Sequence, residues 1–407
     1  MSTKTSREAT ISCLCGSIRQ IVALSPVDTD IVFCHCTACR HMSGELFTSY
    51  VALSSAPASL IGLTKYHSDP DHPNLESTCY CFCSTCGCHV FQRSSYYSDS
   101  DASNDGNNDK EQFEWSVATG VITSSKNDNP SSRIQWQHQN ADDTKDLGLS
   151  LWLPAAFTST PNVSQKANKI LHTSTPPSTR NTNGLDHILP AACHCKRISF
   201  HLFRPSQAST LPHRGYPDAM YSYAVEPERL TSNPHDEKWW LRGPEAQCTS
   251  TSNRTPPIDE NTSFTRYFAA ACVCKSCRLA SGFEIQCWAF VPRCNIQFAS
   301  VEGTLDFNAL PPGLLKRYGS SPGVWREFCP TCGATVFYHA EKAKDVIDVS
   351  VGLFDGDMCD KGARVEDWLE WGRGRVSYAE GVREGRKGGM ADWAERLLEG
   401  LEGGMRG

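Results

Sequence analysis

Short stretches rich in β-branched and aromatic residues recur along the chain, separated by turn residues. They lie at residues 16–24, 46–53, 114–122, 334–339 and 345–354. Such residues favour strands, because their side chains pack well on a pleated, half-buried surface. The pattern therefore predicts a mainly β fold built from short strands.

Helical periodicity is confined to a few places. In "MADWAERLLEGL" (390–401), the apolar positions that recur at helical spacing are Trp393, Leu397, Leu398 and Leu401. This spacing predicts a C-terminal helix that docks on the rest of the protein through one face. A short helical turn is also expected to begin within each Cys-x-Cys-x-x-Cys cluster.

Three cysteine motifs occur twice, in the same order. The first half reads "CLCG", "CHCTACRHMSG" and "FCSTCGCHVF", and the second reads "CHCK", "CVCKSCRLASG" and "FCPTCGATVF". Repeated motifs with the same cysteine spacing indicate an internal duplication. The sequence therefore predicts two tandem domains, at 1–154 and 188–380, followed by a helical tail at 381–407.

Polar segments interrupt and join these domains. An acidic insert at about 94–111 holds too few apolar residues to form a core and is predicted to be disordered. Residues 155–187, rich in Ser, Thr, Pro and Asn, are predicted to form a flexible linker. The second half has its insert at about 204–263, where Trp239 and Trp240 are expected to pin the loop onto the core.

The composition narrows the class of protein. The 407-residue chain has a net charge of −6 and no sustained basic run, so neither nucleic acid nor a membrane is expected as a partner. The N-terminus lacks the apolar core of a secretory signal, and no stretch is apolar enough to cross a bilayer. We therefore expect a soluble, cytoplasmic protein.

Most of the 21 cysteines lie in groups with short spacings. In the reducing cytoplasm, such grouping favours metal ligands over disulfides or scattered core residues.

Each half contributes seven grouped cysteines, which divide into a set of four and a set of three. The sets of four are Cys13, Cys15, Cys83 and Cys86, and Cys193, Cys195, Cys329 and Cys332. Four thiolates predict a closed, structural zinc site. Gly87 and Gly333 follow the last cysteine of each set, where the turn needs a residue that tolerates positive φ. Gly16 follows the opening pair in the first half, but Lys196 replaces it in the second.

The sets of three are the catalytic candidates. They are Cys34, Cys36 and Cys39, and Cys272, Cys274 and Cys277. A metal ion held by three protein ligands keeps one position open, which distinguishes catalytic from structural zinc. A remote residue such as Cys287 could instead close the site, although its counterpart in the first half is Ser49. The sequence thus predicts about two zinc ions per domain, one in a closed site and one in an open site.

Taken together, these motifs resemble the glutathione-dependent formaldehyde-activating enzyme family, which also includes centromere protein V, in a fungal-type tandem form. The resemblance implies two zinc-containing β domains of this family's type and a carbon–sulfur lyase activity. In that activity, glutathione and formaldehyde combine to S-(hydroxymethyl)glutathione. The implied partners are therefore a small-molecule thiol, with glutathione as co-substrate, and an aldehyde.

Two questions stay open at this level. His35 lies inside the first triplet motif, and Val273 replaces it in the second. Its imidazole either takes part in the chemistry or is a packed ring beside the ligands. If the chemistry needs it, only the first half is active. The alternative function is a non-enzymatic, zinc-stabilised β scaffold for protein binding, in which both triplets are closed.

Overall fold

The structure, a computed structural model, describes eight segments of the chain. They are residues 7–25, 31–68, 78–96, 112–125, 135–154, 187–243, 263–355 and 362–407. Apart from their edges, the predicted disordered insert and the linker lie outside these segments, as does part of the second insert. The predictions made for them stay predictions.

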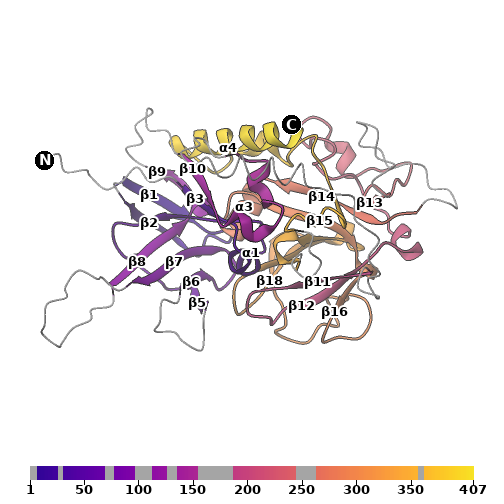
Figure 1. The fold of residues 1–407 in the computed structure, drawn as a ribbon, viewed down its shortest axis with the longest axis horizontal. Coiled ribbons are helices and arrows are strands. Elements are labelled where there is room, and N and C mark those ends of the chain that lie inside the picture. Colours follow the sequence, from indigo (N-terminus) through magenta and orange to yellow (C-terminus); the bar gives the residue numbers. More distant parts are fainter. Residues whose placement is uncertain are drawn as a thin grey trace, which may run out of the picture.

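The first half folds into two sheets, in agreement with the predicted β class (Figure 1). A three-stranded sheet has the order β2-β1-β9, and a seven-stranded sheet has the order β10-β3-β4-β8-β7-β6-β5. The strands are β1 (Arg7–Ser12), β2 (Arg19–Leu24), β3 (Ile31–Cys34), β4 (Thr48–Ala52), β5 (Leu63–His67), β6 (Cys79–Cys83), β7 (His89–Tyr96), β8 (Gln112–Ala118), β9 (Ile122–Ser125) and β10 (Trp136–Gln139).

The second half repeats this arrangement. Its sheets have the orders β11-β12-β16 and β13-β14-β15-β20-β19-β18-β17, and β21 joins the larger one beside β14. The strands are β11 (Ile188–Ala192), β12 (Ser199–Phe203), β13 (Leu241–Arg242), β14 (Arg266–Cys272), β15 (Gln286–Pro292), β16 (Ile296–Phe298), β17 (Lys316–Ser321), β18 (Val324–Phe328), β19 (Thr335–Ala340), β20 (Val346–Ser350) and β21 (Leu369–Trp371).

The duplication is visible in the register of the sheets. Tyr66 on β5 pairs with Tyr80 on β6, and Tyr318 on β17 pairs with Arg326 on β18. β10 lies parallel to β3, and β21 lies parallel to β14. The repeated sequence therefore places corresponding residues at corresponding positions, so the two halves can be compared residue by residue.

Helices are few among the described residues. They are α1 (Thr37–Ser43), α3 (Lys275–Ser281) and α4 (Gly389–Arg406). As predicted, α1 and α3 begin within the Cys-x-Cys-x-x-Cys clusters. Both end at a glycine in the left-handed conformation, Gly44 with φ of 83° and Gly282 with φ of 92°. Shorter 3-10 turns include η1 (Thr119–Val121) and η10 (Val351–Leu353).

The two halves pack against each other reciprocally through α1 and α3. The backbone N–H of Leu14 donates to the carbonyl of Leu279 at 3.1 Å, and that of His194 donates to the carbonyl of His41 at 2.9 Å. Each of these bonds joins the Cys-x-Cys turn of one half to the triplet helix of the other. Because the same contact occurs in both directions, the interface has the self-complementary character of a twofold dimer.

Glycines keep this interface close. A Cβ on Gly44 would lie 2.2 Å from the carbonyl oxygen of Thr335, and one on Gly282 would lie 2.1 Å from that of His89. The N–H of Gly352 also donates to the carbonyl of Gly44 at 3.0 Å. Only glycine leaves room for the two backbones at this point.

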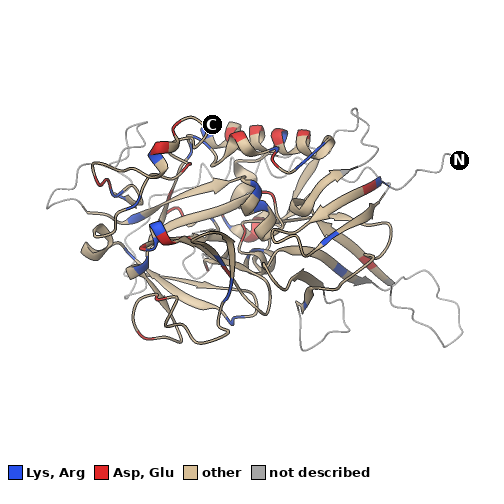
Figure 2. Cartoon of the chain, turned by 180° about the vertical axis from the view of Figure 1, so that it is seen from behind, with Lys and Arg blue, Asp and Glu red and all other residues tan. Residues whose placement is uncertain are grey.

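The C-terminal helix forms as predicted and lies across the top of the molecule in Figure 1. Its apolar face is buried, with Trp393, Leu397 and Leu401 at most 2% exposed. Figure 2 shows acidic residues recurring along the same helix. The nearest neighbours of Gly404 and Gly400 include Trp152 and Leu153 of the first half. The helix therefore links the end of the second half to the first.

The second-half insert is anchored by its two tryptophans, as predicted. Trp239 and Trp240 are fully buried, and the Trp239 ring lies 5.0 Å from that of Phe290 on β15. The indole N–H of Trp240 donates to the carbonyl of Ser209 at 3.0 Å.

No described helix has both the length and the apolar character needed to span a membrane.

Candidate metal centres

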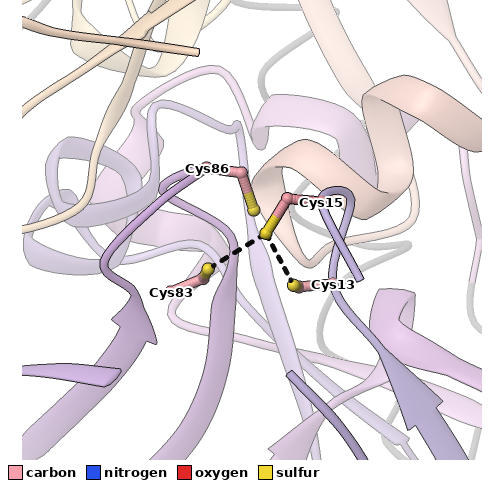
Figure 3. A group of neighbouring side chains, drawn as sticks. All are labelled: Cys13, Cys15, Cys83 and Cys86. Carbon is pink, nitrogen blue, oxygen red and sulfur yellow. Dashed lines mark hydrogen bonds between the residues drawn. The ribbon is translucent and has the colours of Figure 1, made fainter. Parts of the chain in front are cut away.

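The first set of four cysteines converges from two turns. Cys13 and Cys15 lie between β1 and β2, while Cys83 is the last residue of β6 and Cys86 follows it before β7. Figure 3 shows the four side chains together. The Cys15 sulfur is 3.4 Å from that of Cys13 and 3.5 Å from that of Cys83. The sequence places these pairs about 70 residues apart, and the sheet brings them together.

The second half builds the same group. The Cys195 sulfur lies 3.5 Å from those of Cys193 and Cys329. Gly87 and Gly333 adopt φ of 80° and 82°, as the knuckle turns were predicted to require. Lys196 adopts φ of 61° where Gly16 has 77°. The substitution therefore preserves the turn, at a strain of about 1 kcal/mol for a residue with a Cβ.

The donor atoms suit zinc. In each of the four groups, all sulfurs lie within 4.8 Å of one another. A tetrahedral ion with Zn–S bonds of about 2.3 Å needs sulfurs roughly 3.8 Å apart, close to the spacings observed. Only thiols make up these groups, and soft sulfur donors select zinc among the common divalent ions. All 19 cysteines of the described segments are free thiols, while Cys248 and Cys359 lie outside those segments.

The first triplet lies where β3 ends and α1 begins. Cys34 is the last residue of the strand, and its sulfur is 3.6 Å from that of Cys36. Cys36 caps the helix, accepting the backbone N–H of Cys39 at 3.4 Å. The side-chain amide of Asn140 donates to the Cys34 sulfur at 3.3 Å. The backbone and an amide thus orient two of the three sulfurs.

The second triplet has the same frame and different neighbours. Cys274 caps α3 and accepts the N–H of Cys277 at 3.3 Å, with the Ser276 hydroxyl 3.4 Å away. The guanidinium of Arg326 donates to the Cys277 sulfur at 3.6 Å. Tyr378 occupies the position of Asn140, and both have left-handed backbone with φ of 57° and 56°.

Each triplet lacks a fourth ligand from the described segments. No other His, Cys, Asp or Glu of those segments joins either group of three sulfurs. Cys287, weighed as a closing ligand, is buried on β15 opposite Ala271 and belongs to neither group. Exposure also differs between the halves, since Cys34 and Cys36 are half-buried but only Cys274 of the second triplet is.

The three thiols of a triplet influence one another's pKa. Hydrogen bonds from Cys36 and Cys39 lower the pKa of Cys34, while the same contacts contribute to raising the pKa of both partners. Adjacent thiolates repel, so three of them can ionise together only beside a cation. The arrangement is therefore matched to a bound metal ion rather than to three independent nucleophiles.

The His35 imidazole is fully buried. Its Nε2 lies 2.8 Å from Nδ1 of His138, which in turn is held by the Leu153 carbonyl through Nε2 at 2.5 Å. The ring also lies 5.5 Å from that of Phe47. These contacts favour the interpretation of His35 as a packed ring that positions the strand end beside the ligands.

Three residues that the cysteine motifs did not predict interact with the triplets. Asn140 donates to Cys34 and Arg326 donates to Cys277, while Tyr80 is a residue whose pKa the thiol of Cys39 helps to raise. Burial and the neighbouring sulfurs raise the pKa of Tyr80, so this residue stays neutral. The repeat held a signal for two of them, because Tyr80 and Arg326 both stand three residues before a Cys-x-x-Cys-Gly pair. Asn140 had no comparable signal.

Comparison with known proteins gave one match. A family model described as glutathione-dependent formaldehyde-activating enzyme matches residues 8–125 and 259–370. These ranges contain the triplets and most of the four-cysteine groups, whereas Cys193 and Cys195 lie before the second range. No curated protein and no solved structure matched the chain.

Proposed function

The chain belongs to the glutathione-dependent formaldehyde-activating enzyme family, and on that basis we propose that it is a zinc-dependent carbon–sulfur lyase or synthase. Its substrates are a small-molecule thiol and an aldehyde, as in formation of S-(hydroxymethyl)glutathione, and it acts in the cytoplasm. The observation that carries the proposal is the pair of triplets, each with three convergent sulfurs and no fourth protein ligand in the described segments.

The triplet residues would hold the ion and leave one position for a reactant. Zinc bound there supplies a positive charge that stabilises a thiolate or polarises a carbonyl. In the synthetic direction the thiol sulfur bonds to the aldehyde carbon, and the thiol proton passes to the carbonyl oxygen. Bringing the two reactants together removes much of the entropic barrier. The four-cysteine groups would each hold a structural zinc ion, for about four ions per chain.

The first half has the more accessible triplet. Cys34 and Cys36 are half-buried, and Cys39 is 9% exposed. In the second half, Cys272 and Cys277 are each 5% exposed. A reactant reaches the first centre more readily, which supports assigning most of the turnover to the first half.

Exchange spectroscopy tests the proposal directly. Zinc-loaded protein is mixed with glutathione and formaldehyde, and exchange between free and adduct forms is followed by NMR. Acceleration over the uncatalysed reaction is expected, with most of it lost in Cys36→Ser and little of it in Cys274→Ser. Absence of acceleration in fully loaded protein would remove this substrate assignment.

A non-enzymatic scaffold for protein binding is the competing proposal. The more enclosed second triplet favours it, because a buried metal ion resembles a structural one. X-ray absorption at the zinc edge separates the two proposals. Four sulfurs at every ion from protein prepared without added thiol would favour the scaffold, whereas two ions with three sulfurs and one oxygen would favour the enzyme.

A further inference from the structure

Arg326 is a buried cation beside the second triplet. It lies on β18, is 4% exposed, and its Nη2 donates to the Cys277 sulfur at 3.6 Å and to the Ser276 hydroxyl at 3.2 Å. Its Nε and Nη1 are buried without a hydrogen-bond partner. The guanidinium also lies 5.0 Å from the ring of Tyr338. The guanidinium is therefore in direct contact with a sulfur of the second triplet.

The nearby acids do not neutralise this cation. Within the described segments, no carboxylate forms an ion pair with Arg326. Asp348 pairs with Arg214 at 2.7 Å. Glu45, from the first half, is fully buried, and burial raises its pKa, which favours the neutral form. A buried charge without a partner destabilises a protein by several kcal/mol, so the triplet itself must carry the compensating charge.

The first triplet has a neutral residue at the corresponding position. Tyr80 occupies on β6 the position that Arg326 occupies on β18, as their pairing with Tyr66 and Tyr318 shows. The thiol of Cys39, which corresponds to Cys277, is among the groups that raise the pKa of Tyr80, and burial is the largest cause. The two centres therefore share a frame and differ by one formal charge at this position, while Lys275, which stands where the first triplet has Thr37, is paired with Glu384 at 3.3 Å.

The positive charge of Arg326 affects which fourth ligand a metal ion in the triplet can bind. Three thiolates and one divalent ion leave a net charge of about −1, which repels a further anion. Arg326 cancels that charge in the second half, whereas Tyr80 does not cancel it in the first. At such separations in a partly buried site, one added positive charge changes the affinity for an anionic ligand roughly 10- to 100-fold.

We propose that Arg326 makes the second-half centre a site for an anionic sulfur ligand, a small thiolate, while the first-half centre takes a neutral oxygen donor. Arg326 is thus a specificity-determining residue, and the two halves divide the ligand classes between them. This inference rests on the proposed function only in requiring that both triplets hold a metal ion.

Cobalt(II) in place of zinc makes the fourth ligand visible. Cys36→Ser leaves only the second open centre, and Cys274→Ser leaves only the first. Each cobalt-loaded protein is titrated with 2-mercaptoethanol, and the rise in the sulfur-to-cobalt charge-transfer band gives the dissociation constant. We expect the second centre to bind the thiolate at least 10-fold more tightly than the first.

Variants of Arg326, made in the Cys36→Ser protein, test whether Arg326 causes the tighter thiolate binding at the second centre. Arg326→Met should weaken thiolate binding about 10-fold or more, and Arg326→Lys should retain most of it. Tyr80→Phe, changed at the corresponding position of the other half, should leave the second centre unaffected. Near-ultraviolet circular dichroism and bound cobalt show whether each variant is folded and loaded.

Several results would overturn the inference. Equal thiolate affinity at the two centres, or an unchanged affinity in loaded Arg326→Met, would remove it. If Arg326→Met fails to fold, loaded Arg326→Lys decides, and thiolate binding there no tighter than at the first centre would also remove it. Failure of both triplets to hold cobalt would instead overturn the proposed function, so the two failures are distinguishable.

Discussion

His35 and His138 form a hydrogen bond of 2.8 Å between Nε2 of the first ring and Nδ1 of the second. The 2.5 Å contact between Nε2 of His138 and the carbonyl of Leu153 fixes the direction, since a carbonyl only accepts. His138 therefore carries its proton on Nε2, and His35 donates to its free Nδ1. Both rings are neutral, and Nδ1 of His35 is buried without a hydrogen-bond partner.

This pair predicts a loss of stability in mild acid. Burial lowers the pKa of His35 to about 3 and that of His138 to about 4, below the value of about 6.5 in an unfolded chain. Below pH 6.5 the unfolded chain takes up protons that the folded pair refuses, so the contribution is present above that pH and is lost toward pH 4. Urea unfolding at pH 7.5 and 5.5 should show a drop of about 1–3 kcal/mol from these two rings.

The matched variants for that experiment are His138→Gln and His213→Gln. Glutamine at position 138 keeps a donor and an acceptor but does not titrate, so its stability should depend less steeply on pH by about 1 kcal/mol. His213 is an exposed residue whose Nδ1 lies 2.8 Å from Asp236, so its replacement controls for the loss of a histidine that does not belong to the buried pair. An equal slope in all three proteins would contradict the neutral pair.

Adjacent glycines in α4 test its docking on the first half. A Cβ on Gly404 would lie 2.0 Å from the Trp152 carbonyl oxygen, whereas one on Gly403 would meet nothing within 4 Å. Gly404→Ala should therefore lose about 1–3 kcal/mol through overpacking. Gly403→Ala should gain up to about 1 kcal/mol from helix propensity. Thermal unfolding measures both, and equal shifts would show that the helix does not rest on Trp152.

The interface between the halves is tested by a second glycine pair. Gly44 and Gly303 both have positive φ, at 83° and 87°, so alanine strains the backbone at either site. Only Gly44 faces a backbone atom of the other half, the Thr335 carbonyl oxygen at 2.2 Å from its would-be Cβ. Gly44→Ala should destabilise by at least 1 kcal/mol more than Gly303→Ala in urea unfolding. A similar loss in both would mean that the close approach is dispensable.

Serine substitutions separate the two classes of metal centre. Cys86→Ser removes a ligand from a closed group, and the loss should unfold the first half, because zinc contributes on the order of 10–16 kcal/mol to such sites. Cys36→Ser should remove only the triplet ion, since serine remains a good cap for α1. Bound zinc and circular dichroism measured together give the answer. Loss of fold in both variants would contradict the division into structural and open centres.

A chelator should release the ions in a fixed order. The triplets hold zinc through three thiolates and the closed groups through four, so fewer bonds must break at a triplet. We expect about half of the bound zinc to leave in a fast phase and the rest with unfolding. Release of all zinc in a single phase would argue against two kinds of site.

The repeated motifs carried most of what could be predicted. They identified the helical turns at the triplets and the members of all four cysteine groups, while the β class followed from the stretches rich in β-branched and aromatic residues. The reciprocal packing of the two halves could not be predicted from the motifs, because Leu14 and His41 contact the other half through backbone atoms. The left-handed backbone of Lys196 could not be predicted either, because a residue with a Cβ disfavours that conformation. Asn140 reaches Cys34 only once β10 has paired with β3.

The mutual contact between the two halves has an evolutionary consequence. A self-complementary contact in a homodimer must tolerate every mutation twice, once on each side of the axis. Joining both copies in one polypeptide lifts that constraint and keeps the copies together at high effective concentration. Each copy is then free to diverge. The second half has Val273 where the first has His35, and it has Arg326 where the first has Tyr80.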